Sequence, residues 1–282
     1  MSYHLSSKAF EDPALPELLK RLGTYFQRHE IPFYLVGAAA RDIVLGMIHH
    51  RKTRRKTNDL DVAIMIRDWA IFEKVSADFS NSTDFIKSSR QKQRWHYKDH
   101  LILDMIPFGE IARSDRKIYW PPDETPVMSV SGFTAMAKKA LTIILDNELL
   151  VGVASLPGLF VLKLAAWKDR HLVNNKDADD IAGLLDEYLD INIERAAVEH
   201  RDIFEPRDFT TFLAGAILMA RDVGALLADD PSLRVEVCRM LLEEIDQKEQ
   251  SLLVQQILET HRLKKYDEVL KGLTLMESEL RK

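Results

Sequence analysis

The segment Asp59–Ile66 (DLDVAIMI) narrows the possible folds of this 282-residue chain more than any other. Leucine, valine and two isoleucines occupy every second position, and both aspartates, an alanine and a methionine occupy the others. Since successive side chains of a strand point to opposite faces of a sheet, the pattern predicts a strand with one buried face. Asp59 and Asp61 are then expected on a common face at the beginning of that strand.

Neighbouring segments predict a mixed α/β region around this strand. Phe33–Val36 is a short apolar run that closes on Gly37, which is typical of a buried strand followed by a tight turn. A proline-rich turn follows at Pro121–Pro126. The other predicted helices are Pro13–Arg28, Ala38–Gly46 and Trp69–Phe79, and the other predicted strands are Asp84–Lys87, Arg94–Tyr97 and Leu101–Ile106.

The pattern changes beyond the proline-rich turn. Leu141–Ala154 is typical of a hairpin that turns at Asp146-Asn147. From Leu156 onward the periodicity is almost entirely helical, with Pro157 at a helix start. We therefore expect two domains, an α/β domain over residues 1–125 and a mainly helical domain over residues 126–282, with a soft boundary between Pro121 and Leu156.

Composition excludes several classes of protein. With 46% hydrophobic and 29% charged residues, the chain has the balance of an ordinary globular protein. A net charge of -5 argues against a generally basic protein that coats nucleic acid. The single cysteine, Cys238, can form neither an internal disulfide nor a multi-cysteine zinc site. Because no segment resembles a membrane span or a secretory signal, we expect a cytoplasmic protein without membrane contact.

The two aspartates at positions i and i+2 indicate a cation site. Carboxylates this close repel each other strongly when no cation is present. Asp104, bounded by apolar residues in Leu101–Ile106, supplies a third carboxylate if the two strands pair. Three carboxylates suit Mg²⁺ or Mn²⁺, which prefer oxygen ligands and keep part of their coordination for substrate phosphates. The alternative is that Asp59 and Asp61 only form the solvent face of an edge strand.

A turn of small residues lies upstream, in the segment Gly37–Asp42 (GAAARD). Small residues between a strand and a helix let backbone N–H groups approach a phosphate closely. Together with the Asp-x-Asp strand and a later acid, this turn resembles the polymerase-β-like nucleotidyltransferase superfamily. It is most similar to the Gly-Gly-x-x-Arg-Asp turn of tRNA nucleotidyltransferases and poly(A) polymerases, with Ala38 in place of the second glycine. Leu156–Leu185 also looks like the bacterial AbiEii-type nucleotidyltransferases, so the resemblance covers about residues 33–185.

The resemblance implies an α+β fold, with a polymerase-β-like mixed sheet and helices followed by an all-helical C-terminal domain. It implies Mg²⁺- or Mn²⁺-dependent transfer of an NMP from an NTP, such as ATP, to a hydroxyl acceptor with release of pyrophosphate. The acceptor would be tRNA or protein in a toxin-like enzyme, with a cognate antitoxin as a further partner. The catalytic and metal-binding residues would be Asp59, Asp61 and Asp104, and the nucleotide-binding residues Gly37, Ala38, Arg41, Lys163 and Asp177.

Several alternatives stay open at this stage. A non-catalytic nucleotide-binding or regulatory module could use the same fold, and a small molecule similar to an aminoglycoside could be the acceptor. Residues 190–282 could instead bind a partner protein. Lys163 lies on an apolar helix stripe, where it either contacts the triphosphate or pairs with an acid such as Asp177.

Two further segments have a functional and a structural interpretation. The basic run Arg51–Lys56 could guide a polyanion to the site, although such runs are usually solvated loops. Trp95 and Tyr97 alternate with polar residues in a predicted strand, where sheet packing is favoured over base stacking.

Overall fold

The computed structural model describes residues 2–51, 59–98 and 100–282, and the chain divides into two compact units, Met1–Ser155 and Leu156–Lys282. The division follows Ser155 because the hairpin over residues 141–153 pairs with strands of the first unit. Residues 126–155 therefore belong to the α/β unit, so the division comes later than residue 125 and lies at the end of the expected range between Pro121 and Leu156. Most of the basic run lies outside the described residues.

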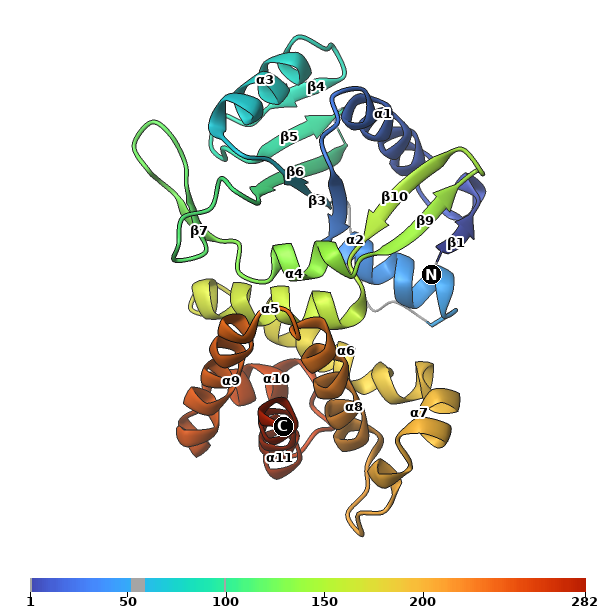
Figure 1. Ribbon diagram of the computed structural model, residues 1–282, viewed down its shortest axis with the longest axis vertical. Helices are drawn as coiled ribbons and strands as arrows, with labels where there is room; N and C mark the ends of the chain where they lie inside the picture. The colour runs from blue at the N-terminus through green and yellow to red at the C-terminus, as the bar shows by residue number, and fades with distance from the viewer. Residues whose placement is uncertain (1, 52–58, 99) are drawn as a thin grey trace. The chain divides into compact units, whose positions relative to one another are not determined.

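A mixed sheet organises the first unit. Its described strands are β1 (Ser2–Leu5), β2 (Phe33–Val36), β3 (Asp59–Met65), β4 (Phe85–Lys87), β5 (Arg94–Tyr97), β6 (Leu101–Phe108), β7 (Lys117–Tyr119), β8 (Val127–Ser129), β9 (Leu141–Leu145) and β10 (Leu149–Val153). Among the described residues, eight of these strands form one sheet in the order β1-β9-β10-β2-β3-β6-β5-β4 (Figure 1). In its centre β3 is antiparallel to β2 and parallel to β6, and β7 pairs separately with β8.

The helices of the first unit agree with the sequence prediction where apolar periodicity is strong. They are α1 (Ala14–Arg28), α2 (Gly37–Asp42), α3 (Trp69–Ser80), α4 (Phe133–Lys138) and a π-helical segment, η2 (Ile43–Ile48). Gly46 does not end the helix after the small-residue turn, since helical structure continues to Ile48. The pattern did not indicate β1, β7, β8 or α4, because each is too short for a periodic signal.

One face of the sheet is apolar and carries the core of the first unit. Trp95 and Tyr97 on β5 are fully buried, which confirms the prediction that they pack in the sheet. Their rings meet aromatic side chains of α3 and β4, with a Phe72–Trp95 centroid distance of 6.0 Å and a Phe85–Tyr97 distance of 4.9 Å. Phe26 of α1 continues this cluster. The opposite face of these strands carries Asp59 and Asp61 of β3, Asp104 of β6 and Arg94 of β5, along with apolar residues such as Ala63 and Ile106.

The second unit consists of helices. They are α5 (Leu156–Arg170), α6 (Lys176–Ile191), α7 (Ile193–Glu199), α8 (Thr211–Leu226), α9 (Pro231–Asp246), α10 (Leu252–Thr260) and α11 (Tyr266–Arg281). α8 is apolar over most of its surface because it packs against both α6 and α11 (Figure 1). The expected α+β class with a helical C-terminal part is confirmed. No helix among the described residues combines the length and apolarity needed to cross a membrane.

Candidate functional site

Strand register aligns the predicted acids in one row across the sheet. Asp61 of β3 pairs with Asp104 of β6, and Asp104 pairs in turn with Arg94 of β5. Because directly paired residues on adjacent strands point to the same face, these three side chains share a face. Asp59, two residues before Asp61, points to the same side. The structure therefore brings together the three acids that the sequence analysis placed in the site.

Exposure differs between the two faces of these strands. Asp59 and Asp61 are partly exposed, whereas Leu60 and Val62, which alternate with them along β3, are buried. Asp104 is more enclosed, with 8% of its surface exposed. The alternative of an edge strand is wrong, because β3 lies between β2 and β6 in the interior of the sheet. The acids therefore lie on an interior strand and on a partly exposed face, a position that suits a binding site better than a purely solvated surface.

Gly37 forms the wall of this site next to Asp61. β2 ends at Val36, which pairs with Asp61, so the following residue lies beside the aspartate. Gly37 has a φ of +64°, a left-handed conformation that disfavours any side chain. A Cβ built at Gly37 would lie 2.0 Å from Oδ2 of Asp61. The carboxylate thus occupies space that only glycine leaves free.

The remaining residues of the turn have ordinary helical roles. Ala38 lies within α2 and is not among the residues with positive φ, so alanine is compatible with this position. Arg41 donates from Nε and from a terminal nitrogen to Oδ1 of Asp42, at 3.0 and 2.9 Å. Both side chains are partly buried. The left-handed conformation is therefore required at the first position of the turn and not at the second.

Asp59, Asp61 and Asp104 form what we call the acid row. Arg94 adjoins this row, although the sequence analysis did not single it out. Its Nε and one terminal nitrogen donate to the two carboxylate oxygens of Asp104 at 2.8 and 2.6 Å. These hydrogen bonds, opposed by burial and assisted by the charges of Asp104, Asp59 and Asp61, raise the pKa of Arg94. The alternation of β5 predicts that Arg94 and Trp95 point to opposite faces of the sheet. Only the strand register shows that Arg94 meets the acids.

The carboxylates of the row are oxygen donors, which suit the Mg²⁺ or Mn²⁺ that its residues suggest. Asp59 and Asp61 share a face, and the carboxylate of Asp61 lies in the space left by Gly37, so two carboxylates fit an oxygen-preferring cation. Within residues 2–51, 59–98 and 100–282, no group of three histidine, cysteine or acidic side chains is arranged to hold a metal. Both carboxylate oxygens of Asp104 accept from Arg94.

Lys163 and Asp177 meet within the second unit. Nζ of Lys163 lies 3.0 Å from Oδ1 of Asp177 and 2.6 Å from Oδ2 of Asp180. Arg170 makes two further hydrogen bonds to Asp177. Burial alone would lower the pKa of Lys163, but the two aspartates outweigh it and hold the pKa above its ordinary value. The structural alternative for Lys163, pairing with Asp177, is therefore present, and its nucleotide contact stays a proposal.

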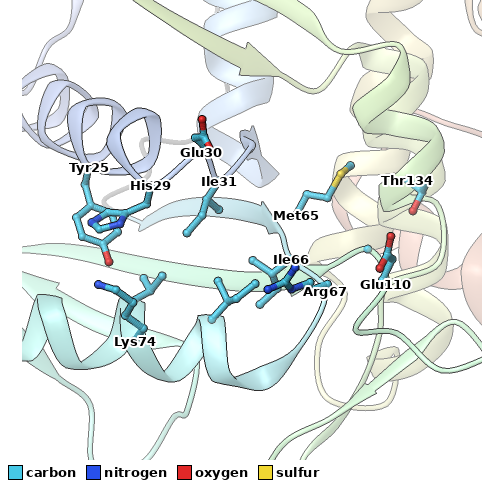
Figure 2. Close-up of a pocket in the computed structure, with 13 residues that line it drawn as sticks. Tyr25, His29, Glu30, Ile31, Met65, Ile66, Arg67, Lys74, Glu110 and Thr134 are labelled. Atoms are coloured by element: carbon cyan, nitrogen blue, oxygen red, sulfur yellow. The ribbon is translucent and has the colours of Figure 1, made fainter.

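A cavity of about 750 Å³ lies at the other end of β3, among Met65, Ile66 and residues of α1 and α3 (Figure 2). Two of its basic side chains are paired: Lys74 contacts Asp78, and Arg67 contacts Asp68. We place the candidate site at the acid row and not in this cavity, because strand register aligns Asp61 with Asp104 beside the end of β2.

Comparison with known proteins yields weak structural similarities. No protein-family model matches the sequence, and no curated protein matches it. The antibiotic-resistance factor ANT(2'')-Ia superposes with a TM-score of 0.34 and 12% identity, over 78% of this chain and 93% of that one. The Thermotoga maritima CCA-adding enzyme complexed with tRNA gives 0.26 and 14%, over 96% and 81%.

A CCA-adding enzyme in complex with CTP also gives a TM-score of 0.26 at 14% identity, over 91% of this chain and 64% of that chain. Superpositions at these scores establish neither a family nor an activity for this chain. The functional assignment therefore depends on the residues of the acid row and the turn beside it.

Proposed function

We propose that the acid row at the beginning of β3 is the active site of a metal-dependent nucleotidyltransferase with a polymerase-β-like fold. The observation that supports this most is the register of β2, β3 and β6, which aligns the end of β2 with Asp61 and Asp104. Gly37 adds a backbone wall against Asp61. A carboxylate row beside a strand-to-helix turn combines donors for a cation with N–H groups for a phosphate.

Each residue has a role in this proposal. Asp59 and Asp61, helped by Asp104, would hold Mg²⁺ or Mn²⁺, which would neutralise the triphosphate and favour ionisation of the acceptor hydroxyl. Asp104 would accept the proton of that hydroxyl. The hydroxyl oxygen forms a bond to the α-phosphorus as the bond to pyrophosphate breaks. Backbone groups of Gly37 and Ala38 and the charge of Arg41 would position the phosphates.

The acceptor is proposed from the AbiEii resemblance. It would be tRNA or protein, in a toxin-like enzyme restrained by a cognate antitoxin. Lys163 and Asp177 of the second unit would complete the nucleotide site, as the corresponding positions do in that resemblance. A small-molecule acceptor is the alternative within the same chemistry.

Label transfer from nucleoside triphosphates tests this proposal. The protein is incubated with Mg²⁺, a fractionated cell extract and each NTP labelled at either the α- or the γ-phosphorus. We expect α-label to enter the RNA, protein or small-molecule fraction and γ-label to leave as pyrophosphate. Asp61→Asn, which keeps the shape of the side chain, should abolish both signals. Transfer of the γ-label, or full activity of the variant, would contradict the proposal.

One observation favours a second candidate, a non-catalytic nucleotide-binding module. Both oxygens of Asp104 accept from Arg94, so the third acid is already engaged. Such a module would bind NTPs with or without Mg²⁺ and release no pyrophosphate in the presence of any extract fraction. The label-transfer experiment therefore separates the two functions.

A further inference from the structure

Arg94 is set into the acid row by the fold itself. β5 is antiparallel to β6, and Arg94 is the direct register partner of Asp104. On its other side Asp104 is the register partner of Asp61. The guanidinium therefore lies at the end of the row Asp61, Asp104, Arg94. The backbone hydrogen bonds of three strands fix these residues in place.

The contact has the geometry of a specific pair. Two parallel N–H···O bonds of 2.8 and 2.6 Å join the guanidinium of Arg94 to both oxygens of Asp104. The two side chains are only 23% and 11% exposed. A fork of this kind is stronger and more directional than a single charged hydrogen bond, and partial burial reduces its screening by salt.

The surrounding charges explain why a cation is needed at this position. Asp59, Asp61 and Asp104 place three carboxylates on one face, which would repel one another without compensation. Charges of all three act on Arg94. Arg94 thus places a positive charge of the protein itself beside these carboxylates before any metal binds.

We propose that Arg94 is a built-in counter-ion that competes with the divalent cation for Asp104 and releases it when a triphosphate offers the guanidinium new oxygen partners. This positioning role rests on the proposed function. Guanidinium pairs with phosphate as readily as with carboxylate, so the triphosphate can replace Asp104 as its partner. Metal and nucleotide then bind cooperatively, because each removes an obstacle to the other.

Mn²⁺ titration followed by electron paramagnetic resonance tests this role without any catalytic turnover. Parent protein and Arg94→Gln are titrated with Mn²⁺ alone and then with Mn²⁺ and α,β-methylene-ATP, which cannot transfer its nucleotide. With Mn²⁺ alone, Arg94→Gln should bind the metal about tenfold more tightly than the parent, because Asp104 is released. The nucleotide should strengthen Mn²⁺ binding about tenfold in the parent and only slightly in the variant.

Two further variants keep the test decisive. Arg94→Lys retains the charge without the fork, so its Mn²⁺ affinity should lie between those of the parent and Arg94→Gln even if the latter folds poorly. Arg21→Gln removes an arginine of α1 that pairs with Asp84, outside the acid row, and should leave Mn²⁺ binding unchanged.

The outcomes separate this inference from the proposed function. Equal or weaker Mn²⁺ binding by Arg94→Gln and Arg94→Lys, or no binding by any of these proteins, overturns the role of Arg94. A parent protein that transfers nucleotide while its Mn²⁺ affinity is insensitive to Arg94 refutes the inference alone. Tighter Mn²⁺ binding by Arg94→Gln without label transfer by the parent supports the inference and refutes the nucleotidyltransferase.

Discussion

Replacing Gly37 by alanine should damage the acid row through a single methyl group. The left-handed conformation of Gly37, at a φ of +64°, costs a residue with a Cβ about 1–2 kcal/mol. The new Cβ would lie 2.0 Å from Oδ2 of Asp61, whereas carbon and oxygen normally approach to about 3.3 Å, so the carboxylate must retreat by roughly 1.3 Å. Together we expect a loss of about 1–3 kcal/mol in the free energy of unfolding.

Thermal unfolding followed by tryptophan fluorescence measures this loss, since Trp69, Trp95 and Trp120 all lie in the first unit. A loss of this size should lower the Tm by about 2–12 °C. Gly183→Ala is the control, because its Cβ meets nothing within 4 Å in the middle of α6, and it should be neutral or stabilising by up to about 1 kcal/mol. A Gly37→Ala protein with the Tm and the metal response of the parent would refute the reasoning.

Two other substitutions test lysines that are largely or partly removed from solvent. Lys163→Met should lower the free energy of unfolding by about 3–5 kcal/mol, because it removes the lysine that pairs with Asp180 in a buried site. An unchanged Tm would show that this ion pair does not contribute to stability. Loss of NTP binding by the folded variant would support the nucleotide contact. Lys87 lies 3.1 Å from the ring centroid of Trp95, and burial lowers its pKa from 10.5 to about 7. Between these values the unfolded chain binds the proton that the folded protein has lost, so stability should rise with pH from about 7 to 10.5. Lys87→Met should flatten that rise in urea titrations at several pH values, and an identical pH profile would contradict the assignment.

Periodicity predicted those elements in which one face is consistently apolar. α1, β2, β3 and β5 begin and end at or within a residue or two of the expected positions, and the hairpin turns at Asp146-Asn147, both with positive φ. The domain boundary stayed open between Pro121 and Leu156 in the sequence, because a local pattern does not reveal that β9 and β10 join a sheet with β1 and β2. Short elements such as α4 give no periodic signal.

The candidate site could be predicted only in part. Asp59 and Asp61 share a face in any strand, so their proximity follows from the sequence. The alignment of Asp104 with Asp61 needs the parallel pairing of β3 with β6, which the sequence analysis could only assume. The contact of Arg94 with Asp104 depends on the antiparallel pairing of β5 with β6, and residues 33–61 give no indication of that pairing. Long-range pairing therefore determines the part of the site that local patterns do not.

Calorimetric titration with nucleotide tests the central claim most directly. The four α,β-methylene nucleoside triphosphates are titrated into the parent protein and into Asp61→Asn, each with and without Mg²⁺. A metal site at Asp59 and Asp61 predicts that Mg²⁺ strengthens the binding of at least one nucleotide about tenfold in the parent and not in the variant. Nucleotide binding that is the same with and without Mg²⁺, or that responds equally to Mg²⁺ in Asp61→Asn, would contradict a metal-dependent nucleotide site in the acid row.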